Sequence, residues 1–165
     1  MKPEHFIREF GVEKARKVVE GAPESASLVF YYFDEVNDEL LGPEYYRDNG
    51  SQHFNKENNS WGFCLDPQII VTEPHDALVS VEDLKRLVDS VDLVNNCGGL
   101  AIANKITFQK RLRNEKATHF IQHPENQKLI QLLGRNQRKP KEAIKFDLFE
   151  QAIRDHESIY GGGDE

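Results

Sequence analysis

Three short groups of residues have types and spacings that could support chemistry. His119 and His123 stand four residues apart, the spacing at which two imidazoles on one helix face can bind a metal ion. Cys97 directly precedes a pair of glycines, where a thiol near a helix end could act as a nucleophile. The stretch FDEVNDE, residues 33–39, offers carboxylates for a nuclease-like metal site.

None of these groups has the companions that its chemistry needs. The histidine pair lacks the glutamate of a zinc-hydrolase helix, which favours ordinary surface histidines. Cys97 follows a predicted helix, whose C-terminal partial negative charge raises a thiol pKa, so a packed thiol is favoured over a nucleophile. The acidic stretch falls in a predicted loop without a basic motif, which favours a solvated loop. No Ser-His-Asp pattern, dinucleotide fingerprint or kinase signature occurs, so we expect no enzyme, no metal and no cofactor.

The glycine pair Gly98-Gly99 is the most motif-like feature of the chain, and three interpretations fit it to different degrees. A phosphate loop needs several glycines after a strand, whereas this pair follows a predicted helix and the later Lys105 is not followed by Ser or Thr. A left-handed helix terminus fits better. A helix-turn-helix DNA reader, with Leu100–Arg113 as its recognition helix, stays open as an alternative.

Charge is distributed unevenly along the chain. Residues 1–104 hold 9 Lys and Arg against 19 Asp and Glu, residues 105–145 hold 11 against 3, and residues 146–165 hold 1 against 6. The middle stretch is therefore a candidate surface for nucleic acid or a partner protein, or an internal counter-charge for the acidic parts. The candidate binding residues are Lys105, Lys110, Arg111, Arg113, Lys116, Arg135, Arg138, Lys139 and Lys141.

The N-terminal half alternates between helical and strand patterns. Apolar residues at helical spacing predict a helix from Pro3 to Gly21, which Gly11 can divide in two. Aromatic and β-branched runs then predict an antiparallel meander with a tight turn at Asn49-Gly50. Its strands are Ser25–Phe33, Tyr45–Arg47, Gln52–Phe54 and Ser60–Leu65, and a further short strand at Gln68–Val71 is an open alternative.

The C-terminal half reads mainly as helix. Ser80-x-x-Asp83 resembles a capping box at the start of an apolar stripe that ends before the glycine pair. The further predicted helices are Leu100–Leu112 with a continuation toward Phe120, Pro124–Gly134, and Lys141–Tyr160.

These patterns predict an α+β fold, in which a small antiparallel meander of three to four strands packs against helices and the C-terminal half is helical. We expect one domain over residues 1–160, made of 1–79 and of a helical part 80–160 that contains the basic segment 105–145, with a flexible tail at 161–165. Mean hydropathy is −0.64, and no run approaches the length of a membrane span. The N-terminus lacks a signal-peptide core, and Cys64 and Cys97 are expected as reduced thiols, so a cytosolic protein is predicted.

A family resemblance extends over most of this pattern. The stretches FGVEKARKVVEGAPESAS, NNSWGFC, LVSVEDLKRLVDSVDLVNNCGGLAIANK and QAIRDHESIYGGGDE resemble small early-region accessory proteins of lambdoid bacteriophages and enterobacterial prophages. The basic stretch from Thr107 to Lys141 has no match in that resemblance. The resemblance implies a bacterial host cell and binding to host or phage components, and it brings no catalytic residues.

The sequence therefore predicts a non-enzymatic phage or prophage protein that binds and modulates a host or phage protein in the bacterial cytosol. The alternative is a nucleic-acid-binding regulator that uses residues 105–141. No membrane partner is expected, and a homo-oligomer is possible.

Overall fold

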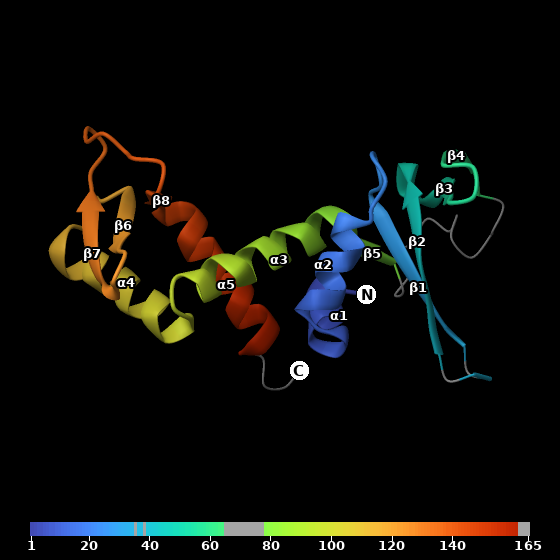
Figure 1. Cartoon of the computed structure of the whole chain (residues 1–165), viewed down its shortest axis with the longest axis horizontal. Helices are drawn as coiled ribbons and strands as arrows, with labels where there is room; N and C mark the ends of the chain where they lie inside the picture. The colour runs from blue at the N-terminus through green and yellow to red at the C-terminus, as the bar shows by residue number, and fades with distance from the viewer. Residues whose placement is uncertain (35, 38, 65–77, 162–165) are drawn as a thin grey trace. The chain divides into compact units, whose positions relative to one another are not determined.

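The computed structural model describes residues 1–34, 36–37, 39–64 and 78–161 (Figure 1). The chain divides into two compact units, unit 1 (Met1–Val88) and unit 2 (Asp89–Glu165), and the division falls inside helix α3 (Val81–Asn96). Each unit combines helices with an antiparallel sheet, which confirms the predicted α+β class. That the two units form the single domain expected for residues 1–160 stays a prediction.

Unit 1 begins with two short helices, α1 (Pro3–Phe10) and α2 (Val12–Glu20). The break between them at Gly11 is confirmed: its φ of 89° lies in the left-handed region that glycine enters without a steric penalty. Pro3 lies in the first turn of α1, as predicted. The backbone N–H groups of a first helical turn have no acceptor within the helix, so the N–H that proline lacks is not missed there.

The sheet of unit 1 has five strands in the order β4-β3-β2-β1-β5, and every pairing in it is antiparallel. The predicted meander of three to four strands is confirmed as β1 to β4, whereas β5, which pairs with β1, was not predicted. The turn at Asn49-Gly50 has positive φ angles of 56° and 90°. The alternative strand at Gln68–Val71 lies outside the described residues. The strands are β1 (Leu28–Asp34), β2 (Glu39–Arg47), β3 (Gln52–Asn55), β4 (Ser60–Phe63) and β5 (Leu78–Ser80), with the single 3-10 turn η1 (Asp48–Gly50) between β2 and β3.

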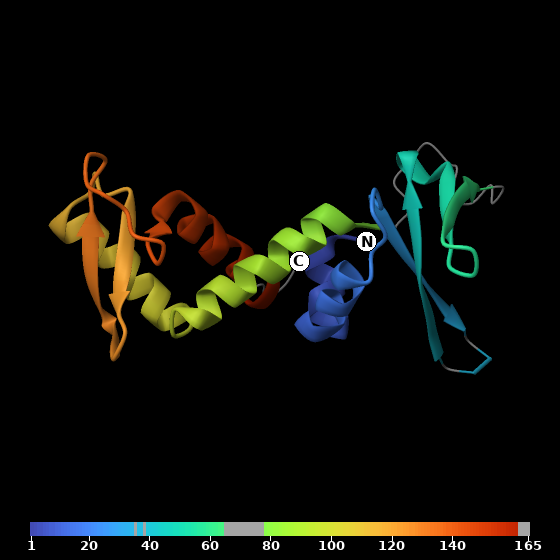
Figure 2. The same cartoon turned by 45° about the horizontal axis from the view of Figure 1, so that its top comes forward.

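Helices α1 and α2 pack on one face of this sheet at β1 and β2 (Figure 2). The hydroxyl of Tyr45 in β2 donates a hydrogen bond of 2.6 Å to the carbonyl of Val18 in α2. The ring of Phe6 in α1 lies 5.6 Å from that of Tyr31 in β1, centroid to centroid. Because neighbouring residues of a strand point to opposite faces, Tyr46 lies on the other face, where it is buried.

The start of α3 and the glycine pair behave as the sequence predicts. The backbone N–H of Asp83 donates to the hydroxyl of Ser80 at 3.2 Å, which is the hydroxyl half of the predicted capping box. At the other end, the N–H of Gly99 donates to the carbonyl of Val94 at 3.0 Å, and Gly98 and Gly99 have φ angles of 110° and 98°. The pair is thus a helix terminus, after which α4 (Leu100–Arg113) begins.

The predicted continuation of α4 toward Phe120 and the predicted helix Pro124–Gly134 are both wrong. Unit 2 instead has a three-stranded antiparallel sheet in the order β7-β6-β8. Proline at the start of a turn needs the same φ as proline at the start of a helix, so Pro124 fits both structures. The strands are β6 (His119–His123), β7 (Asn126–Leu133) and β8 (Ile144–Lys145), and α5 (Phe146–Tyr160) follows them.

The core of unit 2 lies between its sheet and its helices. Phe120 of β6 is fully buried, and its ring centroid lies 4.9 Å from that of Phe146 and 4.8 Å from that of Phe149. From α4, Ala103 and Ile106 are buried in the same cluster. One face of α4 and one face of α5 are therefore fixed against the sheet.

We expect Phe120→Ala to lower the free energy of unfolding by about 3–5 kcal/mol, because it removes a buried ring and leaves a cavity. Urea unfolding followed by circular dichroism measures the change. Leu148→Ala on α5 is the matched control, since this side chain is 62% exposed and its loss should cost less than about 0.5 kcal/mol. Equal losses in the two variants would contradict the placement of Phe120 in the core.

Candidate functional site

The nine candidate cations all lie in unit 2, in three segments. Four are on α4, one follows it in the connection 114–118, and four lie in the connection 134–143 between β7 and β8. In chain order they are Lys105, Lys110, Arg111 and Arg113, then Lys116, then Arg135, Arg138, Lys139 and Lys141.

The sheet register brings two of these segments to the same end of the sheet. His119 at the start of β6 pairs with Leu133 at the end of β7, and Phe120 pairs with Ile144 of β8. The N–H of Thr118 also donates to the carbonyl of Leu133 at 2.9 Å. We call the cations of the two connections the basic end; they are Lys116, Arg135, Arg138, Lys139 and Lys141.

Lys105 does not belong to this group. It lies eight residues before Arg113, or about 12 Å along the helix axis at the rise of an α-helix.

Three of the nine cations are engaged within unit 2. Lys110 forms an ion pair of 3.2 Å with Glu150 of α5, and its ammonium lies 5.0 Å from the ring centroid of Phe146. Arg113 donates to the carbonyl of Ile130 at 3.4 Å, and Lys139 donates to the carbonyl of Arg135 at 2.8 Å. These side chains hold the unit together, so they are poor candidates for contact with a ligand.

The other six cations have no ion pair or side-chain hydrogen bond within the described part of the chain. They are Lys105, Arg111, Lys116, Arg135, Arg138 and Lys141. The contact Lys110–Glu150 is the one ion pair that the segment 105–145 makes with other described residues. Most of the Lys and Arg side chains of this segment are exposed. Its alternative role as a counter-charge for the acidic parts of the chain stays a prediction.

The outward side of α4 carries apolar side chains that the sequence analysis did not single out. Phe108 and Leu112, one helical turn apart, are 58% and 69% exposed. Ala101 and Lys105 lie on the same side at helical spacing and are exposed as well. We call these four residues the α4 ridge. From the sequence alone, Phe108 and Leu112 are apolar residues of a predicted helix. The structure shows that they face outward, because Ala103 and Ile106 are the α4 residues that are buried in the core.

The two flanks of α4 are already occupied. On one flank, the side-chain amide of Gln109 donates to the backbone carbonyl of Lys128 at 3.1 Å. On the same flank, Arg113 donates to the carbonyl of Ile130, two residues further along the edge strand β7. On the other flank, Arg111 of α4 and Arg154 of α5 line a polar cleft of about 320 Å³ together with Glu150 and Glu157. The charges of this cleft balance, so it favours neither an anion nor a cation as ligand.

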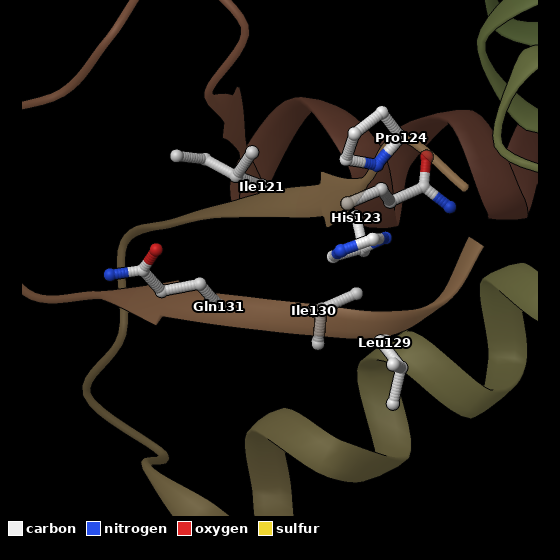
Figure 3. Close-up of a pocket in the computed structure, with 7 residues that line it drawn as sticks. Ile121, His123, Pro124, Leu129, Ile130 and Gln131 are labelled. Atoms are coloured by element: carbon white, nitrogen blue, oxygen red, sulfur yellow. The ribbon is translucent and has the colours of Figure 1, made fainter. Parts of the chain in front are cut away.

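A more apolar hollow of about 300 Å³ lies at the β6–β7 hairpin (Figure 3). Ile121, His123 and Leu129 are among the residues that line it. His119 and His123 lie on this strand and not on a helix, so four residues separate them by about 13 Å, too far to share one metal ion. Among the described residues, no three His, Cys, Asp or Glu side chains gather as a metal site.

Cys97 is a packed thiol, as predicted. It is 1% exposed, and its burial raises its pKa to about 11, so it stays protonated at neutral pH. Cys64 is also buried, and both cysteines are free thiols. A protonated, inaccessible sulfur cannot serve as a nucleophile.

No family model, no curated protein and no solved structure matches this chain. In the part of the chain that is described, no helix combines the length and apolar character needed to cross a bilayer.

The raised pKa of Cys97 predicts a loss of stability at alkaline pH. Below pH 9 the thiol is protonated in the folded and unfolded chains alike; between pH 9 and 11 only the unfolded thiol ionises, which favours unfolding. Urea unfolding of the natural chain and of Cys97→Ala from pH 8 to 11 isolates this effect. As pH rises, the free energy of unfolding of the natural chain should fall relative to that of Cys97→Ala. A difference that stays constant with pH would contradict this prediction.

Proposed function

We propose that this chain is a non-enzymatic accessory protein of bacteriophage or prophage origin that binds and modulates a host or phage protein in the bacterial cytosol. The phage context rests on the sequence resemblance. The binding role rests on one observation: the α4 ridge presents Phe108 and Leu112 to solvent beside Lys105 and Arg111, which form no ion pair with any described residue.

The composition of the ridge suits a protein partner. A few apolar anchors, aromatic ones above all, supply most of the binding free energy at protein interfaces. Phe108 and Leu112 stand one turn apart on a helix that the core holds rigid, so little conformational entropy is lost when they are covered. Lys105 and Arg111 beside them would favour acidic residues around the partner's apolar groove.

The same contacts argue against α4 as a DNA-reading helix. Of the polar residues that could read bases or phosphates, Gln109, Lys110 and Arg113 are engaged within unit 2. Three of the four ridge residues are apolar, whereas a recognition helix presents mainly hydrogen-bonding side chains to the groove.

A second candidate function is nucleic-acid binding at the basic end. The observation that favours it is a group of cations there that form no ion pair within the described ranges, namely Lys116, Arg135, Arg138 and Lys141. Cations gathered on two neighbouring connections can contact successive phosphates.

A photo-crosslinking amino acid at position 108 tests the protein-binding proposal in the bacterial host. We expect an adduct of one discrete mass, which weakens when Lys105→Glu and Arg111→Glu are added, because charge reversal repels an acidic partner. The readout is mass spectrometry of the isolated adduct. An adduct of twice 19.0 kDa would identify a second copy of the chain as the partner.

The same probe at position 148 is the control, since Leu148 is also exposed but lies on α5. The proposal is contradicted if positions 108 and 148 give the same set of adducts, because both would then report only random encounters.

A salt titration tests the second candidate. If the basic end binds duplex DNA or single-stranded RNA, the logarithm of affinity should fall with the logarithm of salt concentration by about 0.7–0.9 per phosphate neutralised. Reversing Arg135 and Arg138 to Glu should then remove most of the binding. Lys17→Glu with Lys85→Glu, at two exposed positions of unit 1, changes the net charge equally. Equal losses in the two double variants would exclude the basic end as the specific site.

A further inference from the structure

The hairpin β3–β4 of unit 1 carries a second surface, whose chemistry is opposite to that of the basic end. Its strands pair through Gln52 with Phe63 and through Phe54 with Trp61. Because alternate residues of a strand share a face, the side chains of Phe54, Trp61 and Phe63 lie on one side of the hairpin. We call these three residues the aromatic face.

The aromatic face is partly organised and partly open. The rings of Phe54 and Trp61 lie 5.2 Å apart in an edge-to-face arrangement at 62°. Phe63 at the edge strand β4 is 86% exposed, an unusual state for so large an apolar side chain. Tyr45 on the same sheet face is covered by α2.

The structure already contains a cation on these rings. The guanidinium of Arg47 in β2 lies 4.6 Å from the ring centroid of Trp61, and its Nε donates to the side-chain oxygen of Gln52 at 2.6 Å. This contact demonstrates that a guanidinium fits against the indole at this position. One face of Trp61 is therefore taken, while the neighbouring Phe63 ring is free to receive another cation.

The charge of unit 1 decides which ligand this surface suits. Residues 1–88 contain 9 Lys and Arg against 17 Asp and Glu, a net charge of −8. Two exposed carboxylates, those of Asp48 and Glu57, lie in the turns that bound the hairpin strands. Such a field repels the phosphates of a nucleic acid and attracts a basic segment.

We propose that the aromatic face binds an arginine-rich segment of a partner protein, whose guanidinium groups stack on Phe63 and its neighbours within the acidic field of unit 1. This surface is separate in residues and in charge from the α4 ridge and the basic end. The chain would then be an adaptor with one surface for an acidic partner and one for a basic partner, and each can be tested without the other.

The test uses the full chain and a synthetic peptide of alternating Arg and Gly, twelve residues long. Trp61 is the single tryptophan of the chain, so its fluorescence reports directly on the proposed site. We expect a saturable change in Trp61 emission at low salt, and at least about tenfold weaker binding for Phe63→Ala. Tyr160→Ala, at an exposed aromatic residue of unit 2, is the matched control and should bind the peptide normally.

A second variant frees the occupied ring. Arg47→Gln removes the internal guanidinium from Trp61. The peptide should therefore bind Arg47→Gln more tightly than it binds Lys17→Gln, although both variants lose one positive charge. Circular dichroism checks that each variant is folded.

Three results would overturn the proposal. The first is the absence of a saturable emission change at millimolar peptide. The second is binding that Phe63→Ala leaves unchanged, since general charge attraction would then suffice. The third is binding of single-stranded RNA that is lost in Phe63→Ala, because the rings would then stack on bases.

Discussion

The burial of Phe120 against Phe146 and Phe149 is the contact on which the architecture of unit 2 depends. One ring from β6 and two from α5 can be removed from water together only if the sheet and α5 meet along one face. Ala103 and Ile106 complete this cluster, so the rotation of α4 about its axis is fixed as well. The exposure of Phe108 on the opposite side of α4 is a direct consequence of that packing.

Both candidate surfaces place aromatic side chains in water beside charges of a single prevailing sign. On α4 the apolar side chains lie beside Lys105 and Arg111, which pair with no carboxylate in the part of the chain that the structure describes. On the β3–β4 hairpin the rings belong to an acidic unit. Apolar anchors provide affinity, while the surrounding charge selects partners and speeds their encounter.

The sequence predicts correctly those helix and turn boundaries that a specific residue type, such as glycine or a capping serine, produces locally. Gly11 divides the first helix, Asn49-Gly50 forms the turn, and Ser80 caps α3. Residues 124–134 were misassigned because the apolar positions 129, 130, 132 and 133 fit a helix stripe better than a strand, on which 130 and 132 share one face and 129 and 133 the other. Pairing with β6 decides between them, and that contact is not encoded locally. The α4 ridge was missed for a related reason: hydropathy marks a side chain as apolar, but tertiary packing decides whether it is covered.

We propose that the α4 ridge is exposed in the isolated chain and covered by a partner in the host. Single cysteines at positions 108 and 148, in a chain whose own Cys64 and Cys97 are buried, allow a direct measurement of maleimide labelling rates. We predict fast labelling at both positions in the purified protein, and protection of position 108 alone inside host cells. Equal labelling of the two positions inside the cells would contradict the account.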